Sequence, residues 1–317
     1  MRALTGTIQS YDAPSTQEIA QRVGLPVERI LRFDGNTSPQ ALPSTRAEAL
    51  AGELGRVHTY PHGGYPELEH AIASYAGVAP ENVVLGAGAD DLILLVTRSF
   101  ASPGDRVAIA NDPTYPMFPI SVWVAGAEVG DDDPVLTISC QPNNPTGDLG
   151  QLPSARPLVV DEAYFEYSGA TAAGLIDDDV IVLRTFSKAF GLAGARVGYA
   201  LAGRDVALEL NKRQHPAPVS TLSAALALAG LASPPDVTPI LEERERMAER
   251  LRELGFQPLP SAANFLYVPV HDPQADYDRL LQHGLAVRPV RGGIRITIRT
   301  PEDDERLFDA LASSHDV

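Results

Sequence analysis

Short runs of apolar and β-branched residues alternate with helical patterns through the middle of the chain. Helical spacing of apolar positions occurs at 90–100 and 204–211. Strands that alternate with helices are typical of a largely parallel sheet covered by helices. The predicted strands are 83–85, 106–110, 135–140, 158–160, 180–183 and 197–201. We therefore expect one α/β domain in this part of the chain.

A second pattern begins after the apolar stretch 222–231. Ser233-Pro234-Pro235 interrupts the chain, and 237–254 has the pattern of a charged amphipathic helix. The elements expected beyond it are a strand at 265–268, a helix at 276–283, a strand at 294–298 and a last helix from Pro301. They predict a small α+β domain at 233–317, following a large domain at 36–232. Residues 1–35 are expected to pack on the small domain or to bridge to it.

Composition excludes several classes of protein. A chain of 317 residues, 44% hydrophobic and 21% charged, is long enough for two lobes and typical of a folded globular protein. The net charge of −16 argues against nucleic acid or an anionic membrane surface as a partner. Cys140 is the only cysteine, so neither an internal disulfide nor a four-ligand zinc site can form, and no metal is expected. The sequence shows no apolar signal-peptide core or spanning stretch, and we expect a cytoplasmic protein.

The segment 184–198 carries the most informative chemistry. It follows a predicted strand and places two hydroxyls, Thr185 and Ser187, just before Lys188, with Arg196 eight residues later. A phosphate monoester needs hydroxyl, amide and guanidinium donors, and a carbonyl cofactor needs an amine nucleophile. One loop offers all of these groups. The alternative, for an isolated Ser-Lys pair, is a solvated loop lysine.

Two further polar residues follow predicted strands. Asp161 ends the strand 158–160, at the edge where open α/β sheets bind ligands, and a carboxylate there can pair with a pyridinium nitrogen. Asn144 lies in the turn 141–147, where proline and glycine can hold its amide in one direction. A helix-capping aspartate and an ordinary Asn-Pro turn are the alternatives.

The loop 86–91 lies between a strand and a helix, where free backbone N–H groups can hold a phosphate. Its glycines also resemble part of a dinucleotide-binding fingerprint. The third glycine and the acid about 20 residues further on are missing, so nicotinamide binding is the weaker interpretation. A non-catalytic protein that retains the fold is a further alternative.

Taken in this order, these segments resemble the fold-type I pyridoxal-phosphate aminotransferases of classes I and II, over about residues 31–300. Within that family the sequence is most similar to the histidinol-phosphate aminotransferases and the related threonine-phosphate decarboxylases. The resemblance implies a large domain with a mainly parallel seven-stranded sheet, a small α+β domain, pyridoxal 5′-phosphate as cofactor, and a homodimer with a shared active site. It also implies amino transfer between an amino-acid or amino-phosphate donor and a 2-keto acid, with decarboxylation of a phosphorylated amino acid as the alternative.

The resemblance also implies roles for individual residues. Lys188 would carry the cofactor as a Schiff base and then move a proton, Asp161 would pair with the pyridine nitrogen, and Tyr115 would stack on the ring. Asn144 and Tyr164 would hydrogen-bond the ring's phenolic oxygen, and Asn144 would also bind the substrate. Tyr60 would reach the cofactor phosphate of the neighbouring subunit. The residues that match the family's phosphate site are Ala89, Asp90, Thr185, Ser187 and Arg196.

Departures from the family pattern concern the substrate. Arg295 matches an arginine that binds the substrate carboxylate, or the substrate phosphate in the histidinol-phosphate group, and Arg288 could add a second anion contact. The stretch between these arginines is shorter than usual, and Arg299-Thr300 replaces Gly-Thr. The segment 33–39, with Asn36 as a predicted substrate-binding residue, and His62 also differ from the usual pattern. These residues therefore do not determine which donor and acceptor the protein uses.

Overall fold

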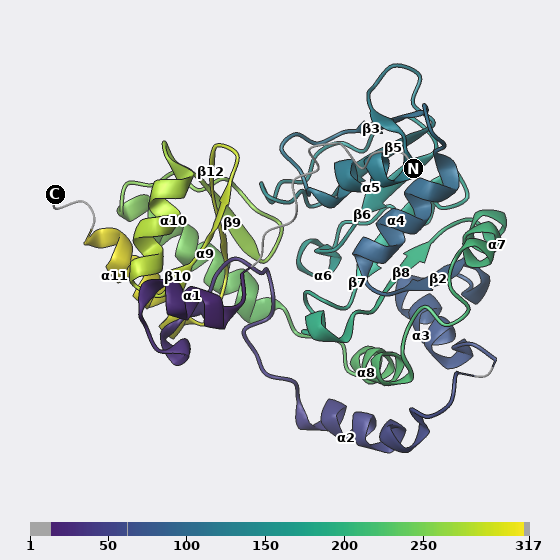
Figure 1. Cartoon of the computed structure of the whole chain (residues 1–317), viewed down its shortest axis with the longest axis horizontal. Coiled ribbons are helices and arrows are strands. Elements are labelled where there is room, and N and C mark those ends of the chain that lie inside the picture. The colour runs from purple at the N-terminus through teal and green to yellow at the C-terminus, as the bar shows by residue number, and fades with distance from the viewer. Residues whose placement is uncertain (1–13, 62, 314–317) are drawn as a thin grey trace.

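The computed structural model describes residues 14–61 and 63–313. Figure 1 shows two lobes, a larger one around a long twisted sheet and a smaller one around a short sheet. From residue 14, the chain lies beside the small lobe, where β1 pairs with β10, and it then crosses to the large lobe. This crossing brings residues from both ends of the sequence to the boundary between the lobes.

The large sheet has seven strands in the order β2-β8-β7-β6-β5-β3-β4. Strands β4, β3, β5, β6 and β7 run parallel, whereas β8 is antiparallel to both of its neighbours. The strands are β2 Val83–Gly86, β3 Arg106–Ile109, β4 Glu128–Val129, β5 Leu136–Cys140, β6 Leu158–Asp161, β7 Val180–Thr185 and β8 Gly198–Leu201. The expected mainly parallel seven-stranded sheet is confirmed.

Both faces of this sheet are covered, which explains why its strands are apolar almost throughout. Leu158 and Val160 pack with α3 and α8 on one face, and Val159 packs with α4 and α5 on the other. The helices of the large lobe are α2 Ser44–Glu53, α3 Pro66–Ala76, α4 Ala89–Phe100, α5 Met117–Ala125, α6 Phe165–Ser168, α7 Arg204–Arg213 and α8 Thr221–Ala232. Short 3-10 helices lie at Leu54–Arg56, Pro80–Asn82, Ala173–Leu175 and Ala193–Ala195.

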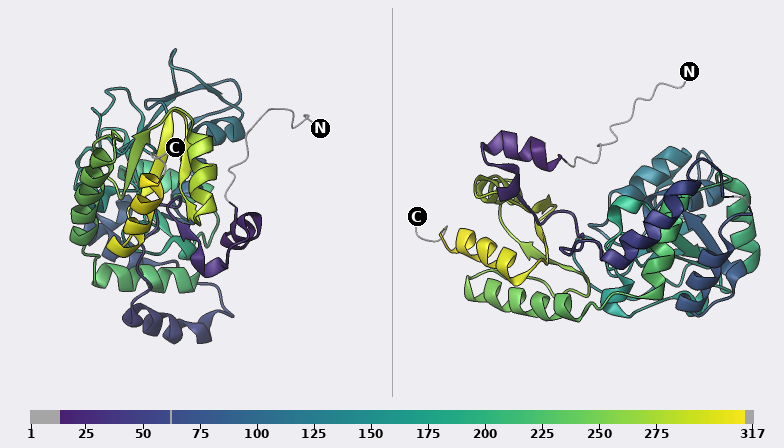
Figure 2. Two further views of the ribbon diagram at one scale, coloured as in Figure 1. Left: turned by 90° about the vertical axis from the view of Figure 1, so that its left-hand side faces the viewer. Right: turned by 90° about the horizontal axis from the view of Figure 1, so that it is seen from below.

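The small lobe contains an antiparallel sheet in the order β11-β12-β9. Its elements are α9 Thr238–Glu253, β9 Phe265–Pro269, α10 Pro273–Gln282, β10 Leu285–Ala286, β11 Arg288–Val290, β12 Gly293–Thr297 and α11 Pro301–Ala312. Figure 2 shows these helices around the short sheet. Every element expected from 237 onward is present within a few residues of its predicted bounds, and β10 and β11 are additional.

The N-terminal segment joins the small lobe. Helix α1, Thr16–Val23, begins with a capping box in which Ser15 and Glu18 bond each other's backbone N–H groups, and Val27–Arg29 forms a 3-10 turn. Strand β1, Leu31–Arg32, pairs in parallel with β10, and Ile19 packs with Leu281 and Ala286. We propose the division of the chain at residues 35/36 and 232/233, because β1 pairs with the small lobe and α8 packs on the large sheet.

No helix in the described ranges is both long and apolar enough to cross a bilayer.

Candidate active site

A cavity of about 220 Å³ lies where the large sheet meets the small lobe. Loops that follow β5, β6 and β7 line it, together with the start of α4, the segment 35–37 and Arg295 of β12. Carboxyl ends of neighbouring parallel strands meet at one edge of a sheet, so residues far apart in sequence come together here. The sequence-predicted residues that line this cavity are Asn36, Ala89, Asp90, Tyr115, Asn144, Asp161, Tyr164, Thr185, Ser187, Lys188, Arg196 and Arg295.

Lys188 lies in the loop after β7, with its amine in this cavity. The Nζ atom donates to the carbonyl oxygen of Gly35 at 3.3 Å and lies 5.7 Å from the centre of the Tyr164 ring. Burial, followed by the nearby Arg295 guanidinium, lowers the pKa of the amine from 10.5 to about 8. A lysine with a lowered pKa is available as a nucleophile and as a base near neutral pH.

Asp161 is the last residue of β6 and is 3% exposed. Its Oδ1 accepts a hydrogen bond from the backbone N–H of Ala163 at 3.0 Å. Burial raises the pKa of this carboxyl from 3.8 to about 7. A buried carboxylate in this state favours a cationic group placed beside it, and a protonated pyridine nitrogen is such a group. The neighbouring Glu162 carboxylate bonds Arg184 at 3.0 Å instead of entering the cavity.

Anion donors gather at one end of the cavity. The first turn of α4 leaves backbone N–H groups without partners in the helix, and it begins at Ala89. The hydroxyls of Thr185 and Ser187 lie 2.9 Å apart, and Arg196 Nη2 is 3.0 Å from Asp90 Oδ2. This end of the cavity therefore offers the hydroxyl, amide and guanidinium groups that a phosphate monoester requires.

Gly88 keeps this anion-binding end open. Its φ is +88°, and a Cβ atom at this position would lie 2.8 Å from Arg196 Nη2. The positive φ favours glycine at this position, and the absence of a side chain leaves room for the Arg196 guanidinium.

Aromatic and amide side chains line the sides of the cavity. Tyr115 donates to Asp90 Oδ1 at 2.9 Å, and Asn144 Oδ1 accepts from Arg295 Nη1 at 2.6 Å. The contact with Arg295 occupies the amide oxygen of Asn144 and leaves its NH₂ group as the end that can serve a ligand. Tyr164 is buried, and its hydroxyl accepts from Asn36 Nδ2 at 2.9 Å. The Asn36 amide thus bonds a protein side chain, a contact the sequence did not predict.

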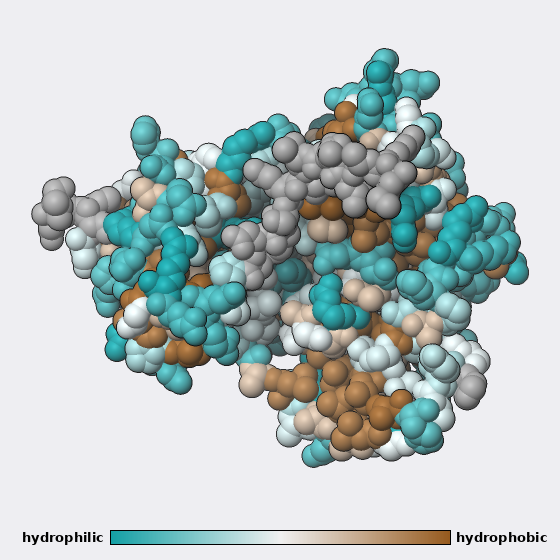
Figure 3. Space-filling model, viewed as in Figure 1, coloured by the Kyte–Doolittle hydropathy of each residue, from teal (hydrophilic) through white to brown (hydrophobic). Residues whose placement is uncertain are grey.

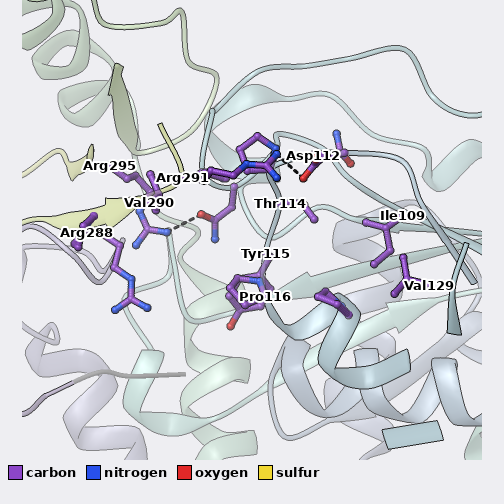
Figure 4. A pocket seen from close by; sticks show the side chains of 16 residues that line it. Ile109, Asp112, Thr114, Tyr115, Pro116, Val129, Arg288, Val290, Arg291 and Arg295 are labelled. Atoms are coloured by element: carbon purple, nitrogen blue, oxygen red, sulfur yellow. Dashed lines mark hydrogen bonds and ion pairs between the residues drawn. The ribbon is translucent and has the colours of Figure 1, made fainter. Parts of the chain in front are cut away.

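A second cavity, of about 570 Å³, adjoins the first and shares Tyr115, Asn144 and Arg295 with it. Figure 4 shows Arg288 and Arg295 on its small-lobe side, with Tyr115 across from them. Arg288 and Arg295 are directly opposite in the β11–β12 pair, which explains why both reach the same space. Their combined charge favours an anionic ligand.

Arg291 also lines this second cavity and was not predicted from the sequence. It pairs with Asp112 of the large lobe at 2.6 Å (Figure 4). Arg291-Gly292 connects β11 to β12, and this turn places Arg291 beside the second cavity. Its position between Arg288 and Arg295 in the sequence was the signal that could have identified it.

Tyr60 does not reach the cavity of its own chain. Its side chain is 81% exposed and lines a separate depression beside Tyr65 and α8. His62 lies outside the described residues.

Comparison with known proteins agrees with this chemistry. The sequence matches the family described as aminotransferase class I and II over residues 29–131 and 132–311. It is 33% identical to the histidinol-phosphate aminotransferase of Thermoanaerobacter pseudethanolicus, covering 88% of this chain and 92% of the relative. The corresponding enzyme of Roseiflexus castenholzii is 35% identical, over 93% of this chain and 92% of the relative.

A solved structure extends the match to three dimensions. The histidinol-phosphate aminotransferase of Sinorhizobium meliloti in complex with pyridoxal-5′-phosphate is 27% identical, with a TM-score of 0.85 and coverage of 99% of this chain and 97% of that one. On the sequence match and the shared fold together, this chain belongs to the class I and II aminotransferases, enzymes that use pyridoxal phosphate.

Proposed function

We propose that this enzyme transfers the amino group of histidinol phosphate, or of a closely similar amino-phosphate donor, to a 2-keto acid. The observation that supports this most is the adjacency of two cavities. One contains an amine, a buried carboxylate and an anion-binding end, and the other is lined by arginines. The curated relatives at 33–35% identity carry the same activity in their names.

Several residues of the first cavity have a proposed role toward the cofactor. Thr185, Ser187, Arg196 and the start of α4 would hold the phosphate, and Asp161 would hold a proton on the pyridine nitrogen. Bound there, pyridoxal phosphate supplies an electron-accepting ring for the reaction. Lys188 Nζ would hold the cofactor before the reaction and then remove the proton from the α-carbon of the amino donor. Tyr115 and Tyr164 would fix the plane of the ring.

The second cavity would hold the substrate phosphate. A guanidinium group presents a planar fork of donors that matches phosphate oxygens, and Arg288 and Arg295 face the same space. Arg291 would assist once it exchanges its exposed contact with Asp112 for the substrate, because an exposed ion pair of this kind contributes only about 0–1 kcal/mol.

The uptake of the cofactor by the cofactor-free protein is expected to depend on pH through Lys188. With a pKa of about 8, the unprotonated fraction of the amine at pH 7 is about one in ten, compared with roughly one in 3,000 for an unperturbed lysine. Only the unprotonated amine can attack the aldehyde, so the uptake rate should rise with pH and level off above about 8. Stopped-flow absorbance over a pH series measures it, with free N-acetyl-lysine correcting for ionisation of the cofactor itself. A rate that keeps rising to pH 10 would contradict the lowered pKa.

The substrate proposal is tested by comparing histidinol phosphate with histidinol, which lacks only the phosphate. We expect kcat/KM to be about 10- to 100-fold higher for the phosphate ester, the effect of one or two charge-assisted hydrogen bonds. Amino transfer is followed with a panel of 2-keto acids. Equal values for the two donors would exclude the phosphate contact, and carbon dioxide release from a phosphorylated amino acid, without consumption of a keto acid, would favour decarboxylation instead.

We further propose a homodimer in which Tyr60 completes the neighbouring active site. Apolar side chains gather over α2 in the lower part of Figure 3. Leu54 (55%) and Val57 (54%), in the segment that leads from α2 to Tyr60, are also exposed. Exposed apolar groups of this kind favour burial against a partner. Mixing Tyr60→Ala and Lys188→Ala proteins should restore activity in the mixed dimers, whereas a monomeric enzyme would show no restoration.

The single, buried Cys140 is compatible with a reducing compartment, and we propose a cytoplasmic location.

A further inference from the structure

Asn36 stands between the two lobes, at the buried edge of the first cavity. Its side-chain Nδ2 donates to the Tyr164 hydroxyl at 2.9 Å. The two residues are only 1% and 2% exposed, so bulk water does not compete for this hydrogen bond. A backbone φ of +50° also favours asparagine here, because asparagine tolerates the left-handed region better than most residues.

The small lobe fixes the orientation of the Asn36 side chain. Thr297 of β12 accepts from the Asn36 backbone N–H at 3.0 Å and donates to Asn36 Oδ1 at 2.9 Å. Asn264, just before β9, donates to the Asn36 carbonyl at 3.1 Å. Since Thr297 occupies the amide oxygen, the NH₂ end of Asn36 is directed to Tyr164.

This hydrogen bond decides what the Tyr164 hydroxyl can do. An oxygen that already accepts from Asn36 keeps its own proton available for an acceptor elsewhere. The Tyr164 ring has an edge-on contact with Phe265, 5.1 Å between ring centres, and the residue lines the first cavity. Burial raises the pKa of the Tyr164 phenol above its ordinary value, so the phenol remains a donor at neutral pH.

We propose that Asn36 is a positioning residue: held by Thr297 of the small lobe, it directs the Tyr164 hydroxyl to donate to the phenolic oxygen of the cofactor. The proposal rests on the proposed function, because it needs the cofactor in the first cavity. It also connects the two lobes, since the position of β12 determines the hydrogen bonding of a large-lobe side chain. Asn36 therefore acts through Tyr164 rather than by contact with the substrate.

The test uses the visible absorbance band of the lysine-bound cofactor in the holoenzyme. Donation to the phenolic oxygen stabilises the deprotonated form of the bound cofactor, so its loss raises the pH midpoint of the band. Asn36→Gly keeps the backbone conformation accessible and adds no charge. We expect it to raise the midpoint by about one pH unit, the size of one hydrogen bond to a charged oxygen. Tyr164→Phe should raise the midpoint at least as much.

The double variant separates this role from a structural one. If Asn36 acts through Tyr164, the Asn36→Gly and Tyr164→Phe changes together should give the same midpoint as Tyr164→Phe alone. Thr297→Val should reproduce part of the shift, and Thr297→Ser, which restores the hydroxyl, should return the midpoint to that of the unmodified enzyme. These two variants also keep the proposal testable if Asn36→Gly does not fold.

Two results would overturn the proposal. One is a midpoint in Asn36→Gly and in Thr297→Val that equals that of the unmodified enzyme. The other is an Asn36→Gly shift of the same size with and without the Tyr164 hydroxyl. Failure of the cofactor placement in the proposed function gives a different result, because the unmodified protein would then show no such band with pyridoxal phosphate. A donor other than histidinol phosphate, or decarboxylation in place of amino transfer, would leave the band and this test unchanged.

Discussion

Replacement of Lys188 by alanine is expected to lower kcat by about 10⁴-fold or more, because in the proposed function this one amine would both hold the cofactor and move the proton. The chain contains only two lysines, Lys188 and Lys212. Lys212 is exposed on α7, where its amine pairs with Glu209 at 2.6 Å. It does not line the first cavity. No second lysine in the cavity could replace the lost amine.

Lys212→Ala is the matched control for this variant. It removes the same kind of side chain and should leave kcat and the visible band unchanged. Steady-state kinetics and the absorbance spectrum of both variants, with circular dichroism to confirm folding, measure the difference. A folded Lys188→Ala enzyme that keeps a tenth of its activity would contradict the role given to this lysine.

Asp161→Asn is expected to lower kcat by about 10²- to 10³-fold, the usual effect of removing one electrostatic partner of a developing charge. The variant keeps the size of the side chain and its ability to accept from Ala163. It loses the charge that would hold a proton on the pyridine nitrogen. Asp161→Glu, which keeps the charge, should recover part of the activity, and wild-type kcat in Asp161→Asn would contradict the pairing.

The same substitution is expected to stabilise the cofactor-free protein. The folded pKa of Asp161 is raised from 3.8 to about 7, so its ionised form destabilises the fold. The penalty grows as the pH rises from about 4 and is complete above about 7. Urea unfolding at pH 8 should show Asp161→Asn more stable by about 2–4 kcal/mol, and by no more than about 1 kcal/mol at pH 4.5. Equal stability at pH 8 would show that the carboxylate carries no such penalty.

The residues that meet in the first cavity could be predicted from the sequence because each is part of a short local pattern. Lys188, Asp161 and Asn144 all follow apolar strands, and parallel strands bring their carboxyl ends to one edge of a sheet. Once the alternation of strands and helices is read correctly, the proximity of these residues follows without further information. The helices of the small lobe were predictable for a different reason, since α9, α10 and α11 are long enough for their apolar period to show.

Other features could not be predicted because the sequence carries no local signal for them. Strands β1, β4 and β10 have two residues each, too few for a period to show. The antiparallel direction of β8 leaves no mark on its apolar pattern. Asn36 and Thr297 are 261 positions apart, and their hydrogen bond depends on how the two lobes pack.

Borohydride reduction of the holoenzyme, followed by trypsin digestion and mass spectrometry, tests the central claim most directly. Reduction makes the link between an amine and the cofactor permanent, and trypsin then no longer cleaves the peptide bond after the modified lysine. We predict one phosphopyridoxyl group on the uncleaved peptide 185–196, which contains Lys188, and none on the peptide that contains Lys212. Modification of Lys212, or of neither lysine, would contradict the account.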